Sequence, residues 1–280
     1  MKKTILIILT LLVCLILSHK AFDKRNNVLS GQITYSAYDD NSHGSFVMEM
    51  ETRQQRFIKE HNNVKFLNDG KMISVKYDSV EMLDSNGNTE RIYDFGEVID
   101  YATMINDSRI SLSCGKSIFQ LNLISGEKTV VVDDNGSKYH DWLSEKLIYS
   151  NVNDEITEYD MSSGFSQKIC GGREPIVSGN NQIIAYKTLE GNLKVLDIQT
   201  SEQHVYNGNA YYYCFSPKSN LLLIEDEMKF FTAISGALFD KQFVGHRIVA
   251  WDFKTNRISE VINRCFSGAG EGFSWQTVLE

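Results

Sequence analysis

The chain has 280 residues, a formal net charge of −8 and 42% hydrophobic residues. This length suits one or two domains with a sizeable core. The body of the chain is acidic and has no basic run. A general nucleic-acid surface is therefore excluded, because phosphate binding needs clustered Lys and Arg. Fifteen Phe and 13 Tyr stand against only 2 Pro, and this composition favours strands over helices.

The first predicted element is a leader. Lys2 and Lys3 precede an uncharged, largely apolar run of signal-peptide length that ends at Ser18. We expect residues 1–22 to be a signal peptide or an N-terminal membrane anchor, and residues 23–280 to form one exported domain. That domain would be periplasmic or held at the outer face of the inner membrane, with membrane contact only through the leader.

A short motif recurs in the rest of the chain: an apolar residue, an acid or amide, another apolar residue, and then a polar turn. Its six copies carry Glu49, Asp84, Asn122, Asp160, Asp197 and Asp252. The spacings are 35, 38, 38, 37 and 55 residues, so the last interval contains an insertion of roughly 18 residues. Short Asp and Asn side chains accept hydrogen bonds from the backbone two residues on. We therefore interpret the repeated residue as part of a turn rather than as a site.

Each period contains four segments with the alternation of half-buried strands. In chain order these segments are 31–38, 45–51 and 54–60; 63–70, 71–77, 79–85 and 88–95; 99–108, 109–114, 117–124 and 127–134; 138–144, 146–152, 155–161 and 166–172; 174–181, 182–188, 192–198 and 202–208; and 210–220, 221–227, 247–253 and 256–262. The first unit lacks its opening strand, and Phe273 to Trp275 supply a spare one at the other end. The sequence therefore predicts an all-β, six-bladed β-propeller of four-stranded antiparallel blades, with the first blade completed by the C-terminal strand.

Two turns carry a resemblance to a known family. "FSPKSN" at 215–220 is followed by "LLLIED" and later by "IVAWDFKTN", and "FLNDGK" occupies 66–71. These stretches resemble the repeats of TolB-type propellers over residues 31–280, although blades three to five lack the Pro-Asp-Gly turn. The resemblance implies an exported six-bladed domain that acts as a protein-docking platform in the cell envelope. Gly245-His246 and Trp251-Asp252 also suggest a WD40-like repeat, but the two pairs lie too close together for the WD signature.

The insertion between the second and third strands of the sixth unit covers residues 228–246 and is strongly apolar. Its candidate partner-binding residues are Phe230, Phe231, Leu238, Phe239 and Phe243. A segment this apolar must be covered by something. It is either a partner-docking hairpin or lid, or a plug packed into the mouth of the channel.

Loops that join second to third strands, and fourth strands to the next blade, share one face of a propeller. On that face the candidate polar residues near the channel are Asp39, Asp40, His61, Asp133, Asp134, Asp154, Arg173 and Tyr211. The face is rich in acids, so it suits a cation or a basic partner. Ordinary solvated loops have the same composition.

Enzyme and metal signatures are absent from the sequence: it has no GxSxG, HExxH or P-loop, and no Cys/His ligand spacing. The four cysteines of the body, which either pair or lie buried, are Cys114, Cys170, Cys214 and Cys265. We expect a non-enzymatic protein-binding module without cofactor or metal. The alternatives are a propeller hydrolase or lyase with its site in the channel mouth, and a purely structural repeat protein.

Overall fold

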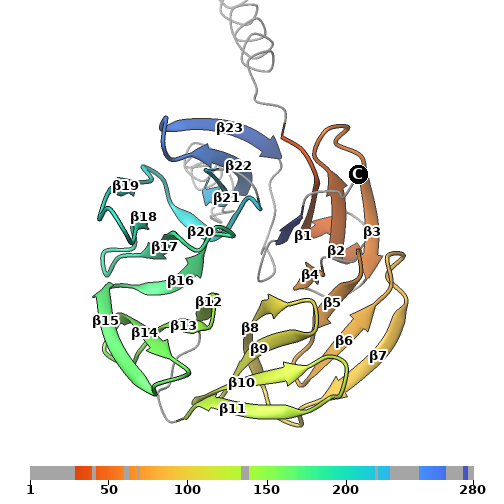
Figure 1. Cartoon of the computed structure of the whole chain (residues 1–280). Helices are drawn as coiled ribbons and strands as arrows, with labels where there is room; N and C mark the ends of the chain where they lie inside the picture. The colour runs from red at the N-terminus through yellow and green to blue at the C-terminus, as the bar shows by residue number, and fades with distance from the viewer. Residues whose placement is uncertain are drawn as a thin grey trace, which may run out of the picture.

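The computed structural model describes residues 29–39, 42–59, 63–67, 70–133, 139–217, 220–227, 246–262 and 274–276. These residues form 24 strands in six four-stranded antiparallel sheets, arranged as blades around a central channel (Figure 1). The predicted six-bladed propeller is confirmed. Within these ranges the chain contains no helix long and apolar enough to cross a membrane.

The strands follow the predicted segments blade by blade. Blade one contains β24 (Ser274–Gln276), β1 (Gln32–Asp39), β2 (Ser42–Glu49) and β3 (Gln55–Lys59). Blade two contains β4 (Val64–Phe66), β5 (Met72–Val75), β6 (Ser79–Leu83) and β7 (Thr89–Asp94). Blade three contains β8 (Ile99–Asn106), β9 (Arg109–Cys114), β10 (Ser117–Asn122) and β11 (Lys128–Val132).

The second half of the ring continues the same pattern. Blade four contains β12 (His140–Leu143), β13 (Lys146–Ser150), β14 (Glu155–Asp160) and β15 (Phe165–Gly171). Blade five contains β16 (Arg173–Val177), β17 (Ile183–Lys187), β18 (Leu193–Asp197) and β19 (Gln203–Val205). Blade six contains β20 (Ala210–Phe215), β21 (Leu221–Glu227), β22 (His246–Asp252) and β23 (Arg257–Ile262). The insertion predicted in blade six falls between β21 and β22, and residues 228–245 lie outside the described ranges.

The position of a strand in its blade decides its composition. All four residues of β5, a second strand, are buried, whereas five of the six residues of β7, the outermost strand of the same blade, are exposed. A second strand is covered by neighbouring blades on both faces, so even a polar residue such as Ser74 of β5 is buried there. An outer strand meets solvent and tolerates charged residues.

Among the described residues the hydrophobic core is divided into six clusters, and each fills the space between two adjacent blades. The cluster between blades five and six contains Trp251, Tyr206 and Phe253, all nearly completely buried. Burying a large apolar side chain contributes roughly 1.5–3 kcal/mol, so these contacts between sheets hold the ring together. The prediction that Trp251 belongs to the core is confirmed.

The ring closes within blade one. β24 pairs with β1 in antiparallel register, with Ile33 opposite Trp275, and thereby joins the two ends of the described chain (Figure 1). On the neighbouring interfaces, the Thr34 hydroxyl donates to the Val64 carbonyl at 2.6 Å, and Arg53 donates to the Val261 carbonyl at 2.8 Å. The predicted closure by the C-terminal strand is confirmed.

The repeated Asp or Asn forms a turn, as predicted. The carboxylate of Asp252 accepts the N–H groups of Lys254 and Thr255, both at 3.1 Å. The same side-chain acceptor role is played by Asp84, Asn122, Asp160 and Asp197. In the first unit the backbone carbonyl of Glu49 accepts instead, from the N–H of Arg53.

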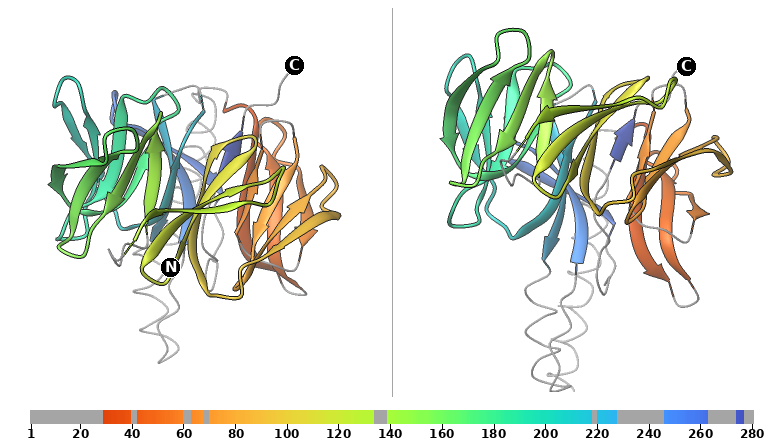
Figure 2. Two further views of the ribbon diagram at one scale, coloured as in Figure 1. Left: turned by 60° about the horizontal axis from the view of Figure 1, so that its bottom comes forward. Right: turned by 90° about the horizontal axis from the view of Figure 1, so that it is seen from below.

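Strands run through the thickness of the ring, so the loops gather on two faces (Figure 2). We call the face with the repeated turns, which also carries the first-to-second-strand loops, the turn face. The opposite face carries the second-to-third-strand loops and the connections between blades. We call it the insertion face, because β21 ends and β22 begins there. Its loops bond one another: the N–H of Ile99 donates to the Tyr77 carbonyl, and that of Gly172 to the Asp154 carbonyl, both at 2.8 Å.

Candidate functional site

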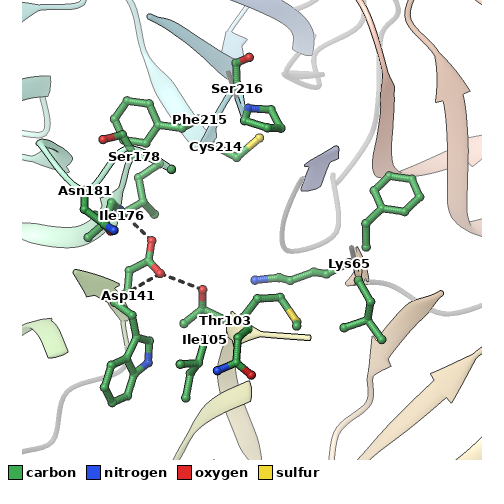
Figure 3. Close-up of a pocket in the computed structure, with 18 of the residues that line it drawn as sticks. Lys65, Thr103, Ile105, Asp141, Ile176, Ser178, Asn181, Cys214, Phe215 and Ser216 are labelled. Carbon is green, nitrogen blue, oxygen red and sulfur yellow. Dashed lines mark hydrogen bonds between the residues drawn. The ribbon is translucent and has the colours of Figure 1, made fainter. Parts of the chain in front are cut away.

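The first strands of the blades line the channel, and their alternation sends every second side chain toward the axis. In β4, Val64 and Phe66 are buried in the cluster between blades one and two. Lys65 lies between them and points the other way, into the channel (Figure 3). The neighbouring first strands place Thr103, on blade three, and Asp141, on blade four, beside the same space.

This space is a cavity of about 540 Å³ at the turn-face end of the channel, which we call the channel chamber. Its walls come from the first strands of blades two to six, and its rim comes from the loops after those strands. The lining residues include Lys65, Phe66, Tyr101, Thr103, Ile105, Asp141, Trp142, Ile176, Tyr213, Cys214 and Phe215, with Asn106, Asp107, Ser144, Asn181 and Pro217 at the rim. Pockets of this size and mixed lining are typical of ligand sites.

Lys65 supplies the cation of the channel chamber. Its ammonium group donates a hydrogen bond to the Ala102 carbonyl of blade three and lies 4.8 Å from the centre of the Tyr101 ring. An ammonium over an aromatic face is stabilised by the ring quadrupole. These contacts hold the long side chain across the channel, where Figure 3 shows it reaching toward Thr103.

Asp141 supplies the anion. Its Oδ1 accepts the N–H of Trp142 at 2.9 Å and the hydroxyl of Thr103 at 3.1 Å, while its Oδ2 accepts the N–H of Val177 at 2.7 Å. Burial raises the pKa of this carboxyl above its ordinary value, and the three hydrogen bonds and Lys65 act in the opposite direction. The side chain therefore ties blades three, four and five together at the chamber wall.

The other reactive groups of the chamber are held neutral. Burial raises the pKa of the Cys214 thiol to about 12, although nearby Lys65 lowers it. Burial likewise raises the pKa of the Tyr101 phenol. A thiol reacts as its thiolate, so Cys214 is unsuited to nucleophilic attack near neutral pH. The chamber is better equipped for binding than for covalent catalysis.

A second, smaller cavity of about 50 Å³ lies toward the insertion face. Four residues line both cavities, Lys65, Tyr101, Ile176 and Tyr213, and they form the constriction between the two. The smaller cavity is otherwise lined by Tyr139, Glu174, Pro175 and Tyr212. This end of the channel is therefore narrow. Beside the smaller cavity the Lys187 ammonium pairs with the Glu174 carboxylate at 2.6 Å, so these two charges neutralise each other.

The insertion face itself displays apolar side chains. Tyr77, Val152 and Leu189 are 73%, 70% and 60% exposed, and each lies in the second-to-third-strand loop of a different blade. Val98 and Tyr211 are exposed on the same face. The same face carries exposed acidic residues, which include Asp78, Asp94, Glu97, Asp133 and Glu190.

The structure describes part of the polar set expected on this face. Arg173 bonds Asp154 with two nitrogens, at 2.6 and 2.5 Å, and this contact lowers the pKa of the Asp154 carboxyl. Asp133 follows β11 and accepts the Ser117 hydroxyl at 2.5 Å. Tyr211 is 38% exposed, and its carbonyl accepts the Lys187 ammonium at 2.9 Å. Of the described members of this set, Asp154 and Arg173 are in direct contact with each other.

The remaining predicted residues are not described. Asp39 is the last residue of β1, but its side chain falls outside the described part, as do Asp40, His61 and Asp134 entirely. The candidate partner-binding residues of the insertion also lie outside the described ranges: Phe230, Phe231, Leu238, Phe239 and Phe243. Their roles stay predictions.

The sequence prediction missed Lys65 and Asp141. Both lie in segments correctly predicted as first strands, "NVKFL" and "HDW". A charged residue inside the innermost strand of a propeller blade must face the channel or be buried between blades. The charged residues within these first strands are visible in the sequence. They place the candidate site at the turn-face end of the channel rather than at the loops of the insertion face.

Metal binding and disulfide bonding find no support in the described residues. Across the described ranges, no group of three or more His, Cys, Asp or Glu is placed to hold a metal ion. Cys114, Cys170 and Cys214 are free thiols, and Cys265 lies outside these ranges.

The closed ring and its channel define the chain as a six-bladed β-propeller. It is similar to the crystal structure of TolB from Acinetobacter baumannii, with a TM-score of 0.67, 13% identity, and 89% of this chain and 67% of that one covered. A putative TolB from Agrobacterium tumefaciens gives a TM-score of 0.60 at 13% identity, covering 89% of this chain and all of that one (100%). The predicted resemblance to TolB-type propellers is confirmed at the level of the fold.

A third similar structure is the Cps50 (Swd1) β-propeller domain of Myceliophteria thermophila. Its TM-score is 0.56 at 11% identity, with 85% of this chain and 88% of that domain covered. No protein-family model and no curated protein sequence matches the chain. At such low identities the structural similarity establishes the fold alone.

Proposed function

We propose that the protein is an exported, non-enzymatic propeller that docks a protein partner on its insertion face. The observation that carries this proposal is the exposure of Tyr77, Val152 and Leu189 at equivalent positions of three blades. Exposed apolar groups framed by polar residues mark interaction sites on soluble proteins. Loops anchored at both ends on paired strands present such groups with less ordering cost on binding than an unstructured segment would.

The charge of this face indicates a basic partner. Arg173 is paired with Asp154 and Lys187 with Glu174, whereas Asp78, Glu97 and Glu190 are exposed acids. A partner that presents Lys and Arg around an apolar centre would match this pattern, because complementary charge speeds association and selects partners. The two strands that flank the apolar insertion, β21 and β22, end and begin at the same face, so we include Phe230 to Phe243 in the proposed dock.

Location in the cell envelope rests on the leader and on the similarity to TolB structures. Fusion of a periplasm-dependent reporter enzyme to the C-terminus tests export, and N-terminal sequencing of the isolated protein tests cleavage near Ser18. An active reporter supports export. A reporter that is inactive although the fusion accumulates rules it out.

The docking test compares two triple variants. Tyr77→Ser, Val152→Ser and Leu189→Ser remove exposed apolar groups from the insertion face. Ile92→Ser, Phe165→Ser and Val205→Ser remove exposed apolar groups from outer strands of blades two, four and five. Both are used as bait for cross-linked partners in envelope extract. Docking on the insertion face predicts that partners are lost only with the first variant. Equal capture by both variants contradicts the proposal.

The insertion is tested separately by deleting residues 230–243. If it belongs to the dock, the shortened protein stays folded but loses its partners. If the partners remain and the protein stays soluble, the insertion does not contribute to docking. A plug packed in the channel would instead reveal itself by a lower melting temperature.

The alternative function, a hydrolase or lyase, has one observation in its favour. The channel chamber is a polar cavity that holds Asp141, whose pKa is raised, and such a carboxyl can serve as a general acid. The neutral Cys214 and Tyr101 beside it supply no activated nucleophile. Three results together would favour this alternative. The purified protein would turn over a substrate, Asp141→Asn would abolish that activity, and Glu145→Ala would retain it.

A further inference from the structure

We propose that the channel chamber is a binding site for a small zwitterion, an amino acid or short peptide, with its carboxylate toward Lys65 and its ammonium toward Asp141. This site lies on the turn-face side of the constriction and is separate from the proposed dock. It does not depend on the docking function. The argument rests on the volume of the chamber, the charges that face it and the hydrogen bonds those charges already make.

The chamber holds two interior charges of opposite sign. Among its described lining residues only Lys65, Asp107 and Asp141 carry formal charge, and Asp107 is an exposed rim residue on the turn after β8. Lys65 enters from blade two and Asp141 from blade four, so a ligand in the chamber meets a cation on one wall and an anion on another (Figure 3).

Asp141 retains capacity to accept a ligand donor. A carboxylate offers about four acceptor sites on its two oxygens. In the described structure Oδ1 accepts two hydrogen bonds, from Thr103 and Trp142, whereas Oδ2 accepts one, from Val177. A ligand ammonium can therefore bond Oδ2 without displacing the contacts that hold blades three to five together.

A dipolar ligand fits this pair better than a singly charged one. Burying one charge is costly unless an opposite charge compensates it. A simple anion would be attracted by Lys65 but repelled by Asp141, and a simple cation would suffer the reverse. A zwitterion brings an opposite charge to each wall and adds no net charge to the chamber.

The remaining walls suit an amino-acid side chain. Phe66, Ile105, Trp142 and Phe215 provide apolar surface, while Ser178 and Asn181 provide polar atoms. A volume of about 540 Å³ exceeds that of one amino acid, so the chamber also has room for a dipeptide.

The test begins with the full chain and named probes. Each of the twenty free L-amino acids, alanyl-leucine and alanyl-phenylalanine is screened by saturation-transfer NMR, and the affinity of the strongest probe is measured by calorimetry. Its N-acetyl derivative and its carboxamide each retain only one of the two charges. The proposal expects each derivative to bind at least about tenfold more weakly, which corresponds to one lost charged contact.

Variants locate the site. Lys65→Met should abolish measurable binding, and Lys71→Met, which removes an exposed lysine paired with Glu90 on blade two, should leave it unchanged. Asp141→Asn is a second probe of the same site if it folds. The proposal is wrong if no probe binds the unmodified protein, if either singly charged derivative binds as tightly as the zwitterion, or if Lys65→Met binds normally.

Discussion

The Oδ2 atom of Asp141 lies 2.7 Å from the backbone nitrogen of Val177, so a single carboxylate joins the inner strands of blades four and five. Its Oδ1 accepts the Thr103 hydroxyl of blade three at the same time. One side chain thus connects three consecutive sheets. Together with the apolar contacts between blades, such a polar connection fixes how the inner strands are placed relative to one another.

Replacing this connection should weaken the fold. Asp141→Ala leaves the Val177 N–H and the Thr103 hydroxyl without their acceptor, and we expect a loss of about 1–3 kcal/mol in the free energy of unfolding. Urea denaturation measures the change. Glu145→Ala, which alters an exposed acid four residues further along, is the control and should unfold as the unmodified protein does. Equal stability of the two variants contradicts the prediction.

Asp141 should also make the free energy of unfolding depend on pH. Burial raises the pKa of its carboxyl, so the folded state binds this proton more tightly than the unfolded chain does. The free energy of unfolding contributed by Asp141 therefore decreases as pH rises from the unfolded pKa, about 3.9, through the raised folded value, and is constant above it. Asp141→Asn lacks this titration. Urea curves from about pH 4 to 8 should show the stability of the unmodified protein falling relative to the variant. A flat or rising difference would falsify the assignment.

Gly208 should tolerate no side chain. An added Cβ would lie 2.4 Å from the Tyr206 ring and 2.6 Å from the Asp226 carboxylate, which Arg247 also bonds at 2.7 Å. Gly208→Ala must displace these groups, and overpacking of this kind costs about 1–3 kcal/mol. Gly171→Ala is the matched control, because its Cβ would meet no atom within 4 Å. Thermal melting should show a lower midpoint for the first variant only.

Closure of the ring can be tested through one backbone N–H. Gln276→Pro and Gln276→Val both remove the side-chain amide, but only proline also removes the backbone N–H at the position opposite Gln32, which faces β1 because the neighbouring residue of β1, Ile33, bonds β2 instead. We expect the proline variant to melt at a lower temperature than the valine variant and to aggregate sooner, since an unpaired β1 exposes a sheet edge. Identical melting of the two variants would show that β24 contributes little to closure.

The fold could be predicted from the sequence because the same pattern is repeated six times. Period-2 alternation located the strands, the spacing of Asp84, Asp160 and Asp197 gave the size of each blade, and the missing first strand identified residues 273–275 as the closing element. These signals are local, or they repeat at a fixed interval, so one chain is enough to reveal them.

The candidate site was harder to predict because it depends on closure of the ring. Lys65 and Asp141 belong to different blades and have no motif in common, and only the circular arrangement brings them to one chamber. From the composition of the loops we predicted Asp154 and Arg173 as site residues. In the structure these two side chains form an ion pair with each other. In a repeat fold, the residues that depart from the repeat in the innermost strands are the more informative ones.

The pairing of β24 with β1 also sets the order in which the molecule can be completed. Strands β1 to β3 precede the strands of blades two to six along the chain, yet the sheet they belong to is completed by residues 274–276, which follow every other described strand. Contacts between segments so distant in sequence form slowly. Blade one is therefore the only described blade that needs both ends of the described chain, and the inner edge of β1 stays unpaired until β24 is in place.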